Sequence, residues 1–154
     1  MKLIELHQKP DIDKNIKLQE AYIEFEKLLL ELREKDLPDG LVLSINKDIE
    51  ELNASSSLGD ELRKIIKKIQ TKNIKLLEKE IKLVPRNYYR KLWTALGMAS
   101  FGIPLGAVLG ASLGNMALIG IGMPIGLALG SGVGSIMDKK AFKEGRQLDV
   151  EIKH

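Results

Sequence analysis

The glycine-rich stretch Gly120–Gly126 is the part of the chain closest to a nucleotide-binding sequence. In a G-x-G-x-x-G turn, glycines that follow a strand and open a helix let backbone N–H groups approach a pyrophosphate. Here the last glycine is displaced by one position, and no strand pattern precedes the stretch. The sequence G-x-x-x-x-G-K-[ST] is also absent. This stretch therefore predicts no cofactor.

Residue types suited to metal binding or nucleophilic catalysis are too scattered to form a site. The chain has no cysteine, and its two histidines, His7 and His154, lie near opposite ends. Neither a metal pair nor a Ser–His relay can be assembled from them. The carboxylates alternate with lysines, and the net charge of +3 is small and evenly mixed. We therefore expect no enzyme activity, no metal and no nucleic-acid partner.

The glycines are instead spaced for helix packing. From Trp93 to Met137 the chain has 45 residues without an acidic, basic or histidine side chain, and this run holds 11 of the 14 glycines. A bilayer-spanning helix needs about 20 apolar residues, so the run can cross twice. Its two halves repeat, with glycine at every fourth residue: Gly102, Gly106, Gly110 and Gly114, then Gly122, Gly126, Gly130 and Gly134. We expect each set to form a groove that admits a second helix closely.

The use of these grooves stays open at this stage. They can pack one hairpin internally, or they can leave surface for association between hairpins. A third interpretation makes 93–137 the buried core of a soluble protein, but the run has no polar face of its own. Pro104 and Pro124 occupy matching places in the two repeats, which predicts two matching kinks.

Basic and aromatic residues flank the apolar run, as is typical of a membrane interface. The expected interfacial residues are Arg86, Tyr88, Tyr89, Arg90, Lys91, Trp93, Lys139 and Lys140. Positive charge on both flanks predicts that both termini face the cytoplasm, and residues 1–10 lack the apolar region of a secretory signal. We expect a hairpin in the inner (cytoplasmic) membrane, with its turn near 115–120 on the far side.

Residues 1–84 carry apolar residues at helical spacing. A helix is expected from about Asp13 to Asp36, capped by Asp11 or Asp13, and a second from about Val42 to Asn53. The first of these helices carries an apolar seam whose spacings alternate between four and three residues: Leu18, Tyr22, Phe25, Leu29 and Leu32. These helices fit either a small bundle or a coiled coil between chains.

A third helix is expected from Leu58 to Val84, opened by a capping box of Ser57 and Asp60. The polar stretch 70–73 interrupts its apolar stripe. Asn73 either fixes the register of a buried layer or lies in a frayed turn facing solvent.

The predicted fold class is all-α, in four parts. Residues 1–84 form cytoplasmic amphipathic helices, 85–92 an interfacial linker, 93–137 a two-helix transmembrane hairpin, and 138–154 a basic cytoplasmic tail.

Residues 95–148 resemble the small bacterial glycine-zipper membrane proteins. The likeness rests on the repeated Gly-x-x-x-Gly hairpin and on the exit Ile136–Leu148, with its Asp-Lys-Lys and Glu-Gly sequences. The resemblance implies membrane insertion and self-association, and some such proteins form pores.

Two functions follow as hypotheses. In the first, the protein is a self-associating membrane protein that perturbs the bilayer or forms a pore, and its cytoplasmic helices control assembly. In the second, the hairpin only anchors a coiled-coil adaptor that binds a cytoplasmic protein. The lipid bilayer is a partner in both, and a homo-oligomer is expected in the first.

Overall fold

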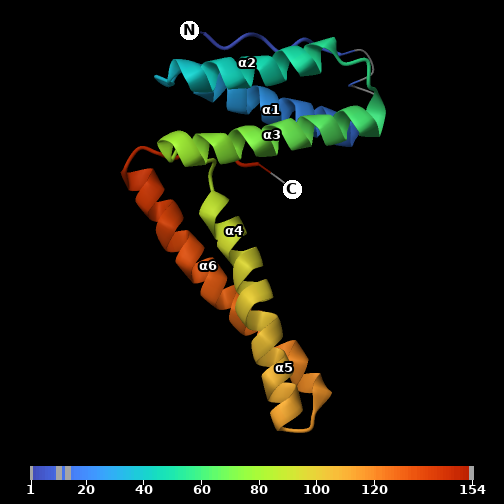
Figure 1. The fold of residues 1–154 in the computed structure, drawn as a ribbon, viewed down its shortest axis with the longest axis vertical. Coiled ribbons are helices and arrows are strands. Elements are labelled where there is room, and N and C mark those ends of the chain that lie inside the picture. The colour runs from blue at the N-terminus through green and yellow to red at the C-terminus, as the bar shows by residue number, and fades with distance from the viewer. Residues whose placement is uncertain (1, 10–11, 13–14, 153–154) are drawn as a thin grey trace. The chain divides into compact units, whose positions relative to one another are not determined.

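A computed structural model describes residues 2–9, 12 and 15–152 of the chain (Figure 1). All regular elements among these residues are helices, which confirms the predicted all-α class. The chain divides into two compact units. The N-terminal unit comprises the described residues up to Pro85 together with those from Leu148 onward, and the hairpin unit is Arg86–Gln147.

Three amphipathic helices build the N-terminal unit: α1 (Ile16–Arg33), α2 (Asp39–Ala54) and α3 (Gly59–Ile81). The predicted α1 seam is buried throughout, and α2 and α3 each turn an apolar face toward the same core. The largest fully buried side chains include Phe25, Leu28, Ile45, Ile49, Ile66 and Leu77. Burial of these faces, rather than helix propensity, stabilises helices of this length.

The helix caps differ from those expected. Asn15 caps α1, because its Oδ1 accepts the N–H of Leu18 at 3.1 Å, whereas Asp11 and Asp13 lie outside the described residues. The predicted capping box of α3 is wrong. Leu58 occupies the N-cap position without a side-chain hydrogen bond, and the N–H of Ser57 donates to Ser55 Oγ at 3.2 Å.

Helix α3 runs without a break through the polar stretch 70–73. Gln70 and Asn73 are each only 1% exposed, so the frayed, solvent-facing turn is wrong. Their side-chain amides have no hydrogen-bond partner among the described residues. Buried polar groups are normally hydrogen-bonded, and leaving one unsatisfied costs about 1–3 kcal/mol.

The end of the chain returns to the N-terminal unit. Leu148, Val150 and Ile152 are buried in alternation with exposed residues, the pattern of an extended segment with one inward face. The N–H of Leu148 donates to the carbonyl of Val84 at 2.9 Å. The segment predicted as one tail, 138–154, is therefore divided between the end of a hairpin helix and this extended segment.

The hairpin unit contains two antiparallel helical stretches joined by a short turn (Figure 1). The first is continuous through α4 (Tyr88–Gly97), a π-helical turn η2 (Met98–Gly102) and α5 (Ile103–Ser112). The second begins with the 3₁₀ turn η3 (Met116–Leu118) and continues as α6 (Ile119–Lys143). By length and composition both can cross a membrane, with mean hydropathies of 1.6 and 1.8.

Candidate functional site: the glycine-lined hairpin

The two glycine sets face each other inside the hairpin. A Cβ built on Gly102 would lie 3.1 Å from the carbonyl oxygen of Gly122, and one on Gly122 would lie 2.7 Å from the Cα of Gly106. A Cβ on Gly110 would meet the side chain of Ile119 at 3.2 Å. Backbone therefore packs directly on backbone along α5 and the start of α6, at a distance that only glycine permits.

The same contact continues along α4. A Cβ on Gly126 would lie 2.7 Å from the Cα of Gly102, and one on Gly130 would lie 2.8 Å from the carbonyl carbon of Trp93. A Cβ on Gly134 would lie 2.5 Å from the carbonyl oxygen of Tyr89. The interface therefore extends to the first turn of α4. Seven of the eight glycines at fourfold spacing lie in it.

Gly114 has a different position. It adopts a left-handed conformation with φ +63°, and nothing lies within 4 Å of a Cβ built on it. It follows the C-terminus of α5, where glycine commonly ends a helix because it accepts positive φ. The residue expected to extend the first groove instead forms the hairpin turn.

Gly97 belongs to the interface, although it does not follow the fourfold spacing of the other glycines. A Cβ there would lie 2.9 Å from the Cα of Gly130, yet Gly97 precedes Gly102 by five residues instead of four. The π-helical turn Met98–Gly102 lies between them, and the N–H of Ile103 donates to the carbonyl of Met98, five residues back. A π turn accommodates one extra residue, so Gly97 stays on the face that carries Gly102.

The two prolines are not equivalent, contrary to the symmetric repeat. Pro104 stands in the first turn of α5, directly after the π turn, whereas Pro124 lies within the continuous helix α6. A proline ring clashes with the carbonyl four residues before it, which for Pro104 is that of Ser100 inside the π turn. The irregular turn relieves this clash and, at the same time, sets the phase of the glycine face.

A carboxylate closes the base of the hairpin. Asp138 follows Gly134 by four residues on α6, is buried, and accepts the N–H groups of Tyr89 and Arg90 at 3.0 and 2.9 Å. These N–H groups belong to the first turn of α4, whose N-cap residue Asn87 makes no side-chain cap. Asp138 therefore caps α4 from the opposite helix, where a negative charge also interacts favourably with the helix dipole.

The predicted interfacial residues cluster at this base with different exposures. Tyr88 and Tyr89 form an edge-to-face pair with ring centroids 5.2 Å apart, and Tyr89 is buried. The remaining members, Arg86, Arg90, Lys91, Trp93, Lys139 and Lys140, are exposed or half-buried. Just beyond α6, the hydrogen bond from Arg146 lowers the pKa of Glu144, so this exposed pair stays ionised beside the base.

The outer surface of the hairpin is apolar. Large exposed side chains follow both helices: Leu96, Phe101, Ile103, Leu105, Val108, Ile121, Met123, Ile125, Leu129 and Val133. Gly120 and Gly132 are also exposed, and a Cβ on either would meet nothing within 4 Å. Two of the glycines of α6 thus remain outside the internal interface.

Metal-binding chemistry is not assembled in the part of the chain that the structure describes. No group of three or more histidine, cysteine, aspartate or glutamate side chains there is placed to hold an ion. Comparison of the chain with protein-family models, with curated proteins and with solved structures finds no match.

Proposed function

We propose that the protein is a membrane-anchored interaction module. The hairpin inserts into the bilayer as a closed anchor, and the N-terminal unit binds a protein partner at the cytoplasmic surface. One observation carries this proposal: the close glycine interface is complete within one chain, while the outward side chains are apolar. Such a hairpin needs lipid around it and does not need a second copy to complete its packing.

The outward surface favours lipid over water. Phe101, Val108 and Leu129 are each more than half exposed. Exposure of apolar surface to water costs roughly 25 cal/mol per Å², and soluble monomers rarely carry contiguous apolar patches larger than a few hundred Å². Ten large apolar side chains along two helices fit acyl chains better than they fit water.

The interior favours an anchor over a pore. Facing glycines bring the backbones of the two helices into contact, which leaves no water path between them. The polar residues between Trp93 and Met137 are few: Thr94, Ser100, Ser112, Asn115, Ser131 and Ser135. A conducting path would normally be lined by charged rings or backbone carbonyls.

Self-association is a second candidate, and a different set of residues favours it. Gly120, Ala128 and Gly132 are exposed and lie at multiples of four along α6. A helix of a second copy can approach such a small-residue face closely. Gly132→Leu tests this candidate, because it blocks the outer face and leaves the inner interface unchanged. Loss of cross-linked oligomers in Gly132→Leu would support it, and an unchanged ladder would exclude this face.

The anchor is tested by single-cysteine accessibility, since the chain has no cysteine of its own. Glu51→Cys places a thiol on the exposed side of α2, and Ala117→Cys places one in the hairpin turn. In intact cells a membrane-impermeant maleimide should label only position 117, and in inverted vesicles only position 51. Carbonate washing should leave both variants in the membrane. Release by carbonate, or labelling of both positions from the same side, would refute the anchored hairpin.

A further inference from the structure

Two asparagines of α2 hold the N-terminal segment 2–9 by its backbone. Asn46 accepts the N–H of Ile4 and donates to the carbonyl of Lys2, both at 3.0 Å. Asn53 accepts the N–H of His7 at 2.8 Å and donates to the carbonyl of Glu5 at 2.9 Å. Each amide thus pairs with a donor and an acceptor two residues apart, which is how a neighbouring β-strand would pair with an extended peptide.

The spacing of the two asparagines matches an extended chain. Asn46 and Asn53 are seven residues apart, or about 10.5 Å along a helix at 1.5 Å per residue. Ile4 and His7 are three residues apart, or about 9 Å in an extended chain at 3.1 Å per residue with three residues per turn, a period that returns both N–H groups to the same side. The two amides therefore read the same register of the peptide backbone, and a shift by one residue would break both pairs.

The remaining contacts involve the backbone of the segment, the side chain of Lys9, and the Glu5 carboxylate, which lies 3.9 Å from the guanidinium of Arg33. Tyr22 on α1 donates its hydroxyl to the carbonyl of Leu6 at 3.2 Å, and Arg33 donates to that of Ile4 at 2.9 Å. Lys9 donates its ammonium to two carbonyls at the end of α2, those of Asn53 and Ser55, at 2.7 and 2.6 Å. A cation is favoured there by the helix dipole.

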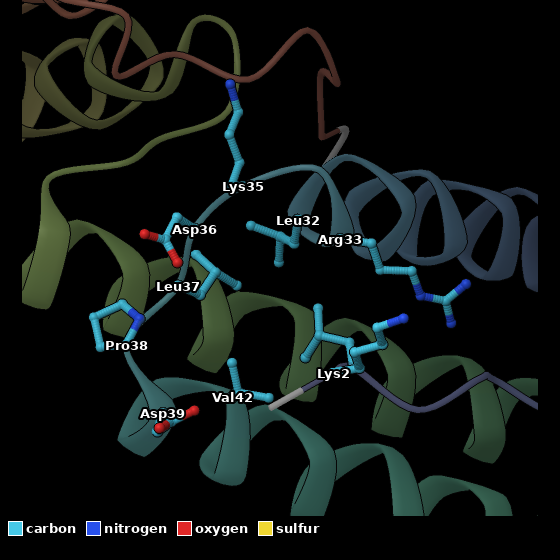
Figure 2. Close-up of a pocket in the computed structure, with 10 residues that line it drawn as sticks. Lys2, Leu32, Arg33, Lys35, Asp36, Leu37, Pro38, Asp39 and Val42 are labelled. Carbon is cyan, nitrogen blue, oxygen red and sulfur yellow. The ribbon is translucent and has the colours of Figure 1, made fainter.

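Few side chains of the segment are buried. Within 2–9 only Leu3 is buried, at 8% exposed, whereas Ile4 and Leu6 are half-buried. At the Leu3 end the segment borders a cavity of about 570 Å³, which the end of α1 and the start of α2 also line (Figure 2). The segment therefore contributes only Leu3 to the buried core, whereas the contacts of α3 with α1 and α2 do not involve it.

We propose that the surface formed by Asn46, Asn53, Tyr22 and Arg33 is a binding site for an extended peptide, and that its partner is the segment 2–9 of a second copy. This inference rests on the proposed function, because the membrane anchor is what brings copies together. Every contact made within one chain is available without change to the same segment of a neighbour, the condition for domain swapping. Exchange therefore needs no new interface.

Release of the segment leaves the amides of Asn46 and Asn53 to water, and the segment of either copy restores their hydrogen bonds. Confinement of many copies to one membrane raises their effective concentration, which turns weak binding between chains into a populated state. Segment exchange thus links N-terminal units while each hairpin stays closed.

The test mixes two full-length variants in proteoliposomes. One carries Ile4→Pro and His7→Pro, which remove the two N–H donors and leave its binding site intact. The other carries Asn46→Ala and Asn53→Ala, which disable its site and leave its segment intact. The second variant also carries Leu3→Cys and the first also carries Val42→Cys, so each has one thiol beside the cavity. A short bismaleimide joins the two thiols, and tags of different size on the two variants identify the hetero-dimer. In the matched control, the first variant carries Gln8→Pro in place of Ile4→Pro and His7→Pro. Gln8 is an exposed residue of the same segment.

The complementing mixture should give at least a several-fold higher yield of the 3–42 cross-link than a mixture in which both partners carry the asparagine substitutions. Equal yields would overturn segment exchange, because proximity alone would then explain the cross-link. In the control, the segment of the Gln8→Pro variant should keep filling the binding site of its own chain. The yield of its cross-link with the asparagine variant should therefore be lower than the yield obtained with the Ile4→Pro/His7→Pro variant. Carbonate extraction is measured on the same samples, so failure of the anchor is seen separately from failure of exchange.

Discussion

Gly126→Ala tests the hairpin interface most directly. The added Cβ would lie 2.6 Å from the carbonyl oxygen of Gly97 and 2.7 Å from the Cα of Gly102, where ordinary contact begins at 3.4 Å. The helices must therefore separate by roughly 0.7 Å, and a gap of that size forfeits a quarter to a half of the dispersion energy of the facing atoms. Overpacking of this kind costs about 1–3 kcal/mol.

Gly132→Ala is the matched control on the same helix. Nothing lies within 4 Å of a Cβ at position 132, so this variant gains only the helix propensity of alanine, about 1 kcal/mol. Because Gly126→Ala gains the same propensity, the two variants should differ in unfolding free energy by the overpacking term, about 1–3 kcal/mol.

The assay follows separation of the two helices in detergent with increasing SDS fraction. Trp93 is the only tryptophan of the chain and serves as the energy-transfer donor. An acceptor dye on Lys139→Cys then reports the distance between Trp93 on α4 and position 139 on α6. A lower midpoint for Gly126→Ala than for Gly132→Ala is expected. Equal midpoints would refute the assignment of backbone packing at Gly126.

Three further predictions follow. Asp138→Ala removes both hydrogen bonds to the first turn of α4, and Asp138→Asn removes one, at about 1.5–3 kcal/mol per bond to a charged group. Amide hydrogen exchange in that turn should therefore accelerate in the order wild type, Asn, Ala. Unchanged rates would contradict the cap. Gln70→Leu and Asn73→Leu replace unsatisfied buried amides and should each raise the free energy of unfolding of the N-terminal unit by roughly 1 kcal/mol or more. Circular dichroism should show this as a higher thermal midpoint, and a lower midpoint in both variants would mean that these amides are satisfied. Burial, and to a smaller extent the charge of Glu26, raises the pKa of Tyr22 from 10.0 to about 12. The folded state therefore favours the neutral phenol, and this contribution to stability is present below pH 10 and lost as the pH rises through 12. Absorbance at 295 nm should show one tyrosine that titrates near 12 and is removed by Tyr22→Phe, whereas titration of this residue near 10 would contradict the prediction.

The fold class could be predicted because it depends on local periodicity. The apolar seam from Leu18 to Leu32 depends on residues three and four positions apart, and such a pattern is visible in a single sequence. The fourfold glycine spacing is equally local, and seven of the eight glycines that it marks lie where the hairpin helices approach.

The parts that could not be predicted depend on residues far apart in the chain. Asp138 caps a helix that begins 50 residues earlier, and Asn46 and Asn53 pair with a segment more than 40 residues away. Gly97 was missed for a local reason, since a search for fourfold spacing assumes a regular α-helix. Pro104 was an ambiguous signal, because Pro124 lies within the continuous helix α6 without an irregular turn before it.

The return of Leu148, Val150 and Ile152 to the N-terminal unit has a consequence for biosynthesis. These residues leave the ribosome after all of the hairpin unit, 86–147, which at 5–20 residues per second takes roughly 3–12 s to translate. The N-terminal unit therefore stays incomplete until the whole hairpin unit has been made. Until Leu148, Val150 and Ile152 are added, the apolar surface that they cover stays exposed.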